Sequence, residues 1–303
     1  MGLVEYPSSS SSSDDGDDAP STKRRRMSKD TESSTLPPLP QSFRDLYSTP
    51  ARLSQTDDPS LHGGRQRAVP HIQGNWSAHV YLEWSPSPTE SHLLTSLVSH
   101  IRSTTSSTTT SLLTDSLSVP LPLHISLSAP LVLRTETKDA FRDTILQSLS
   151  RITRPRPPLT VAPTALSWFT NAERSRSFLV LRVAEHDPPR SPPKTVSEDK
   201  SVLAKLLDAS NAVATRFGCK DLYPAVAGAD GQGSDGFHIS LAWSLDADEA
   251  LDEGALADAR LVELLERAKG IRISFSEVKL RLGKEVSSVP FGRGGRGERS
   301  LLG

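Results

Sequence analysis

The tetrapeptide His124-Ile125-Ser126-Leu127 occurs a second time in this chain, as His238-Ile239-Ser240-Leu241. Both copies lie in short apolar runs typical of β-strands. Because side chains on a strand point alternately to opposite faces, each copy predicts a histidine and a serine on one face and apolar side chains on the other. Either copy alone is more typical of an ordinary strand, but the repetition favours two halves of one active site.

The sequence around these strands predicts an alternation of strands and helices. Ser87, Pro88 and Glu90 have the spacing of a capping box, so a helix should begin at Pro88. Further helices are predicted over 138–150, 199–217 and 257–268. Strands are predicted over 76–84, 122–128, 160–169, 176–184 and 271–281, besides the second histidine strand. This order predicts an α+β fold with two pseudo-symmetric lobes, whose antiparallel sheets and flanking helices surround a central cleft.

Composition divides the 303 residues into four parts. Residues 1–35 form a Ser-rich, acidic tail with a basic run and too few apolar side chains to fold, so disorder is expected. An irregular Pro-rich segment, 36–70, precedes a two-lobed domain over 71–286, and 287–303 is expected to be a C-terminal tail.

Bulk properties exclude several classes of protein. The net charge of −1 disfavours a large non-specific polyanion binder, although it permits a small phosphate pocket. Cys219 is the single cysteine, so neither an intrachain disulfide nor a thiolate zinc site is expected. The chain shows no signal core and no apolar run of membrane-spanning length, which predicts a soluble intracellular protein. The run Lys23–Arg26 resembles a nuclear import signal.

Two histidines that face one phosphate are suited to general acid–base catalysis. Imidazole titrates near neutral pH, so one ring can accept a proton from a nucleophile while the other donates a proton to a leaving oxygen. The two serine hydroxyls can bind the non-bridging phosphate oxygens. No metal is needed, and no carboxylate or further imidazole accompanies either motif as a ligand. The sequence also has no Gly-x-Ser-x-Gly elbow and no Walker-type loop.

The paired His-x-Ser pattern resembles the 2H phosphoesterase superfamily. Flanking stretches narrow the resemblance to the family of nuclear phosphodiesterases that trim the oligouridine tail of U6 small nuclear RNA. These stretches are Asp58 to Arg65, Gly74 to Trp76, His79 to Trp84, Ser175 to Leu179 and Phe237 to Trp243. The resemblance extends from about Leu36 to Phe291.

The resemblance implies a 3′–5′ exoribonuclease without cofactor or metal. A 2′-hydroxyl attacks the adjacent phosphate and leaves a 2′,3′-cyclic phosphate or, after ring opening, a 3′-phosphate. His124 is implied as the base, His238 as the acid, and Ser126 and Ser240 as phosphate ligands. A family tyrosine stacks on the terminal uracil, and Tyr223 is its candidate here, although the insertion 224–236 separates it from the second motif.

The same resemblance defines the expected partners. The substrate is the single-stranded, uridine-rich 3′ end of U6 small nuclear RNA, and DNA is excluded because it lacks the 2′-hydroxyl nucleophile. A monomer that acts in the nucleus and binds no membrane is expected.

Two other interpretations remain open. One is a different 2H activity, such as opening of cyclic phosphates or chemistry at 2′–5′ linkages. The other is a non-enzymatic, RNA-binding spliceosome accessory that keeps the fold. The two intact motifs favour an enzyme, because a scaffold does not need both histidines.

Overall fold

The computed structural model describes residues 72, 74–104, 109–171, 174–186, 200–223, 236–245 and 258–292. All of them belong to one compact unit, Pro40–Gly303. The predictions made for residues 1–35 and 36–70, for nearly all of the insertion 224–236, and for residues after 292 therefore lie outside the described residues.

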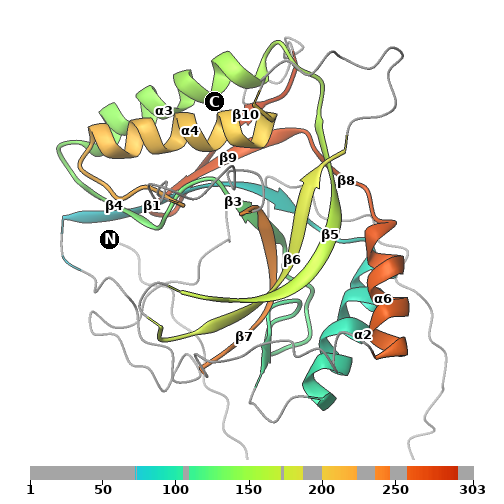
Figure 1. The fold of residues 1–303 in the computed structure, drawn as a ribbon. Coiled ribbons are helices and arrows are strands. Elements are labelled where there is room, and N and C mark those ends of the chain that lie inside the picture. Colours follow the sequence, from blue (N-terminus) through green and yellow to red (C-terminus); the bar gives the residue numbers. More distant parts are fainter. Residues whose placement is uncertain are drawn as a thin grey trace, which may run out of the picture. The chain divides into compact units, whose positions relative to one another are not determined.

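The described strands form one hydrogen-bonded antiparallel sheet, which has two halves (Figure 1). The first half has the order β10 (Glu285–Pro290), β9 (Glu277–Leu282), β1 (Asn75–Trp84) and β3 (Leu123–Ser126), with β4 (Leu131–Arg134) also paired to β1. The second half has the order β7 (His238–Ser244), β6 (Ser177–Glu185), β5 (Leu159–Thr170) and β8 (Ile273–Phe275), with β2 (Thr110–Ser111) also paired to β7.

The halves of the sheet are joined by strand pairing and by short covalent links. The first is the pairing of β3 with β7, in which Ile125 lies opposite Ile239. The second is covalent, because the chain passes from β8 directly into β9 through Ser276. The predicted α+β class with antiparallel strands is confirmed, and its two sheets are halves of one continuous sheet.

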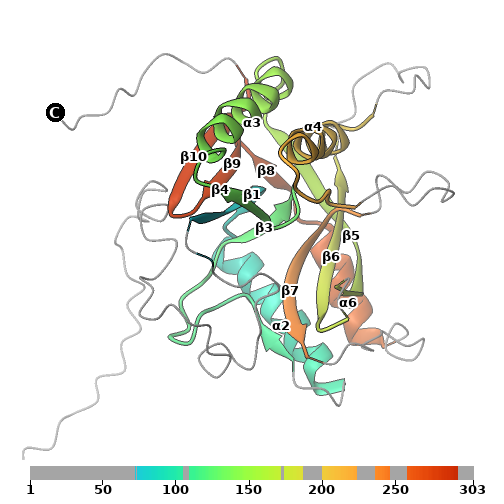
Figure 2. The same cartoon turned by 90° about the vertical axis from the view of Figure 1, so that its left-hand side faces the viewer.

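Four described helices cover the apolar faces of the sheet: α2 (Pro88–Thr104), α3 (Lys138–Thr153), α4 (Val202–Arg216) and α6 (Ala259–Lys269). Helix α3 packs on α4 and on β9 and β10, whereas α2 packs on α6 and α6 on β5 (Figures 1 and 2). Phe141, Ile145 and Leu149 recur at helical spacing on α3 and are fully buried. None of the described helices is long and apolar enough to span a membrane.

The predicted capping box at the start of α2 is confirmed. The Ser87 backbone N–H donates to Glu90 Oε2 at 2.7 Å, and the Glu90 N–H donates to Ser87 Oγ at 3.4 Å. Both bonds satisfy N–H groups that have no partner within the helix. The capping box therefore fixes the turn that connects β1 to α2.

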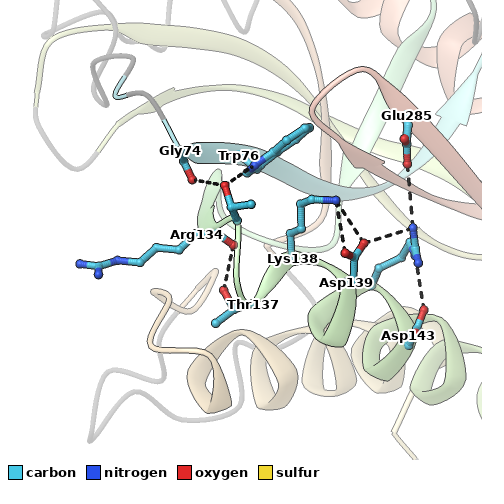
Figure 3. Close-up of polar contacts among 10 residues, drawn as sticks. Gly74, Trp76, Arg134, Thr137, Lys138, Asp139, Asp143 and Glu285 are labelled. Carbon is cyan, nitrogen blue, oxygen red and sulfur yellow. Dashed lines mark hydrogen bonds and ion pairs between the residues drawn. The ribbon is translucent and has the colours of Figure 1, made fainter.

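Polar contacts fix the start of β1 against α3 (Figure 3). Thr135 Oγ1 donates to the Gly74 carbonyl at 3.0 Å and accepts from Trp76 Nε1 at 3.1 Å. The Lys138 ammonium lies 4.8 Å from the centre of the Trp76 ring, within cation–π range. These contacts anchor the strand whose polar face reaches the candidate site.

The C-terminal part of the sheet differs from the prediction. The single strand expected over 271–281 is two strands that break at Ser276, and β10 extends to Pro290, beyond the predicted domain boundary at 286. Gly283 and Lys284 connect β9 to β10, and Gly283 has φ of 60°, as a two-residue hairpin requires. The sequence of β10 gives little sign of a strand, since Val289 is the only one of its apolar residues that is buried.

Candidate active site

The two His-x-Ser motifs are related by an approximate twofold axis at the junction of the half-sheets. Ile125 pairs with Ile239 on antiparallel strands, and both side chains are fully buried. Their neighbours therefore point to the opposite face, His124 across from Ser240 and His238 across from Ser126. Diagonal neighbours on adjacent strands lie about 7–8 Å apart, so one phosphate can lie between the two imidazoles. The structure brings all four predicted residues together.

His124 lies on an open surface yet is crowded by protein. Its side chain is exposed, and its ring contacts those of His79 and Tyr81 edge-on, with centroids 5.4 and 5.9 Å away. Burial by the surrounding protein, together with the positive charges of Arg281 and His238, lowers the pKa of His124 to about 4. The contribution of His238 reflects the convergence of the two histidines. At neutral pH the His124 ring is uncharged and can accept a proton.

A backbone carbonyl determines the tautomer of His238. Its Nδ1 lies 2.8 Å from the Gly236 carbonyl oxygen, which can only accept, so Nδ1 carries the hydrogen. Nε2 is then the nitrogen that exchanges a proton with a ligand. Burial lowers the pKa of His238, the Gly236 carbonyl opposes this, and the positive charge of Arg182 adds to it. Arg182 is the cross-strand partner of His238 on β6.

Tyr223 lies beside His238 in spite of the insertion that separates them in sequence. Asn211 on α4 bonds both backbone groups of Leu222 through its side chain, at 2.9 and 2.8 Å. Tyr223 itself has φ of 50°, and its Oη lies 3.1 Å from His238 Nδ1. Burial raises the pKa of Tyr223 to about 12, so the phenol keeps its proton. The tyrosine predicted to stack on a base therefore also contacts the second histidine.

Sequence reasoning did not single out four further side chains that line this face. His79 and Arg281 lie near His124, whereas Arg182 and Phe169 lie near His238. The Phe169 ring is 42% exposed and its centre lies 5.3 Å from that of His238. Strand alternation could have found His79, because Val80, Leu82 and Trp84 occupy the buried face of the predicted strand 76–84.

A polar cavity of about 420 Å³ adjoins His124 through its cross-strand partner, Glu83. Its lining residues are Glu83, Ser85, Ser274, Ser276, Glu277 and Lys279. The Lys279 side chain is 2% exposed, and its ammonium lies 3.1 Å from Glu83 and 3.8 Å from Glu277. These carboxylates compensate the buried charge. Within the described ranges, no three His, Cys, Asp or Glu side chains cluster as ligands for a metal ion.

The antiparallel α+β fold and the pairing of the two His-x-Ser strands agree with the 2H phosphoesterase resemblance seen in the sequence. The HVSL family, described as an uncharacterised conserved protein, matches residues 37–290. The chain belongs to this family, and the relatives found for it carry the name U6 snRNA phosphodiesterase 1. The family resemblance seen in the sequence is thereby confirmed.

Individual relatives differ in how much of their length is matched. The Neurospora crassa protein is 38% identical over 225 residues, which cover 70% of this chain and 60% of that protein. The Danio rerio protein is 26% identical over 260 residues, which cover 84% of this chain and 80% of that protein. The solved structure of Kluyveromyces marxianus Usb1 with uridine monophosphate has a TM-score of 0.48 and 16% identity, and covers 71% of this chain and 98% of that chain.

Proposed function

We propose that this protein is a metal-independent 3′–5′ exoribonuclease that trims the oligouridine 3′ end of U6 small nuclear RNA in the nucleus. The observation that carries this proposal is the pairing of the two His-x-Ser strands, which places both histidines and both serines on one polar face. The relatives named U6 snRNA phosphodiesterase 1 support the choice of RNA substrate.

In the proposed reaction the RNA supplies its own nucleophile. Neutral His124 removes the proton from the 2′-hydroxyl of the penultimate nucleotide, and O2′ attacks the adjacent phosphorus. The bond from phosphorus to the 5′-oxygen of the terminal nucleotide breaks, and protonated His238 donates its Nε2 proton to that oxygen. The products are an RNA with a 2′,3′-cyclic phosphate and a nucleoside with a free 5′-hydroxyl. Later ring opening by water would convert the cyclic end to a 3′-phosphate.

The surrounding groups support these roles by charge and hydrogen bonding. Ser126 and Ser240 donate to the non-bridging oxygens, where negative charge develops. Arg281 and Arg182 add positive charge on either side of the phosphate. A bound phosphate also favours protonated imidazole, so substrate binding raises the pKa of His238 and supplies the acid.

The terminal nucleotide lies on the His238 side in this scheme, since His238 protonates its 5′-oxygen. Tyr223 is next to His238 and is proposed to stack on the terminal uracil. No cofactor takes part, and the protein acts as a monomer.

The decisive test is incubation of the full-length protein with an oligouridine-tailed RNA, followed by mass analysis of the RNA ends. We expect shortened chains with cyclic-phosphate or 3′-phosphate ends, in the presence of EDTA as in its absence. A 2′-deoxy substitution at the penultimate position should block cleavage, because the nucleophile is missing. His124→Ala and His238→Ala should each lower kcat by about 10²- to 10⁴-fold.

Other outcomes identify the alternatives. Loss of trimming in EDTA would refute the metal-independent mechanism. Opening of a supplied 2′,3′-cyclic phosphate without chain shortening would indicate a different 2H activity. Tight RNA binding with no product, unchanged in both histidine variants, would indicate a non-enzymatic RNA-binding accessory.

A further inference from the structure

A third histidine contacts the candidate site, and the proposed mechanism does not use it. His79 lies on the polar face of β1, and its Nε2 is 3.1 Å from Ser126 Oγ. Its ring stacks on Tyr81 with centroids 5.2 Å apart and meets His124 edge-on at 5.4 Å. These contacts hold the imidazole on two sides, so its Nε2 stays directed at the serine.

We propose that His79 is a positioning residue that donates a hydrogen bond to Ser126 and so directs the Ser126 hydroxyl hydrogen at the phosphate. This inference rests on the proposed function, because it assigns a role within the same site. A hydroxyl has one hydrogen and two acceptor lone pairs. If His79 Nε2 carries a hydrogen, Ser126 accepts that bond and keeps its own hydrogen for the substrate. If Nε2 carries no hydrogen, the Ser126 hydroxyl donates its only hydrogen to the histidine and has none left for the substrate.

The electrostatics of the site favour the donating arrangement. Burial, together with the charges of His124 and Arg281, lowers the pKa of His79 to about 3, so the ring is neutral with one N–H. An anionic phosphate polarises the serine hydroxyl toward itself. A chain of donors from imidazole N–H to serine O–H to phosphate oxygen is then aligned, and each bond strengthens the next. The bound anion therefore selects the Nε2–H tautomer.

The approximate twofold axis supplies an internal comparison. Ser240 is the counterpart of Ser126, and their partners on the outer strands are Val180 on β6 and Tyr81 on β1. Of the two serines, only Ser126 has an imidazole at hydrogen-bond distance among the described residues, because His79 Nε2 lies 3.1 Å from its Oγ. The two serines are consequently unequal, and the effect of His79 should pass through Ser126 and not through Ser240.

Double-mutant cycles on trimming of an oligouridine RNA test this inference. His79→Leu removes the donor and should lower kcat about tenfold, the size of one lost hydrogen bond, with little change in KM. His79→Gln retains an N–H donor and should recover most of that loss. In a Ser126→Ala background His79→Leu should cause no further loss, whereas in a Ser240→Ala background it should cause the full tenfold loss.

Three outcomes would overturn the inference: equal losses in both serine backgrounds, a loss confined to KM, or no loss at all. If the wild-type protein trims no RNA, the proposed function fails, and the tautomer of His79 is then determined by nitrogen NMR with uridine 3′-monophosphate bound. A hydrogen on Nε2 of His79 would still support the positioning role, and an Nε2 without a hydrogen would refute it. Thermal unfolding of each variant identifies any general loss of structure.

Discussion

The two histidines of the candidate site have different neighbours, although their motifs are identical. Glu83 is the cross-strand partner of His124, and Arg182 is that of His238. The Glu83 carboxylate is paired with Lys279, so it does not hold a proton on His124. Arg182 makes protonated His238 a stronger acid, which suits a proton donor once a phosphate is bound. The register of the sheet thus makes two identical motifs chemically unequal.

The pKa directions predict an acid-shifted pH profile. The base must be neutral, and the pKa of His124 is about 4, so kcat/KM should fall on the acid side only near that pH. The acid must be protonated, and the pKa of His238 is below 6.5, so the alkaline fall should begin below that value. In kcat both limbs should move to higher pH, because bound phosphate raises both pKa values. Initial rates across the pH range at constant ionic strength measure this.

Two charge variants test the assignment of the alkaline limb, one beside His238 and one distant from it as a control. Arg182→Gln removes a positive charge beside His238 and should move the alkaline limb of kcat/KM to higher pH. Arg151→Gln removes a charge in the last turn of α3 and should leave the profile unchanged. An acid limb of kcat/KM at pH 6.5 or above in the wild-type protein would contradict the proposed assignment of His124.

At the scale of elements, local sequence signals predicted most of what is seen. The capping box of α2 and the alternation in β1 depend on neighbours only two to four residues away, and both are confirmed. The sequence does not predict the β9–β10 hairpin, because the apolar residues of its outer strand do not alternate and only Val289 is buried. The strongest sequence sign of this hairpin is Gly283 in its turn. A larger residue would not fit there, because an added Cβ would lie 2.9 Å from the Trp76 ring. Such an edge strand lacks the hydrophobic alternation on which sequence reasoning depends.

The capping box provides a stability prediction for α2. Ser87→Ala removes the acceptor for the Glu90 N–H and should lower the free energy of unfolding by about 1 kcal/mol. Ser96→Ala is the control, since Ser96 lies within the same helix and bonds only the His92 carbonyl four residues before. Ala favours helix interiors, so this variant should be neutral or slightly stabilising. Urea unfolding midpoints at constant m-value compare the two, and equal losses would rule out a specific capping contribution.

At the scale of the whole described unit, the site depends on how two half-sheets meet. Ile125 and Ile239 form the pair between β3 and β7, and both are fully buried. Each isoleucine is flanked by the histidine and the serine of its own motif. The packing of this pair therefore determines how far apart the two imidazoles lie.

Truncation of this pair should affect stability and activity together. Ile125→Ala should cost about 2–5 kcal/mol of unfolding free energy, and Ile125→Val about 0.5–1.5 kcal/mol. Ile145→Ala on α3 is a matched control, because Ile145 is equally buried but lies on a helix that packs mainly on α4, β9 and β10. At a temperature where all variants are folded, kcat/KM for oligouridine RNA should fall in Ile125→Ala and be retained in Ile145→Ala. Equal activity in both would show that the pair does not control the site.

The sequence by itself determined the helices, the principal strands, the α+β class and the four His-x-Ser residues, since these follow from short-range periodicity and from a repeated motif. The placement of Tyr223 against His238 needed the tertiary structure, because Asn211 on α4 fixes the preceding residue from outside the motif. The tertiary structure was also needed to place His79 against Ser126, and to place Glu83 beside His124 and Arg182 beside His238. Such contacts join residues that are distant along the chain, and only strand pairing and packing decide which of them meet.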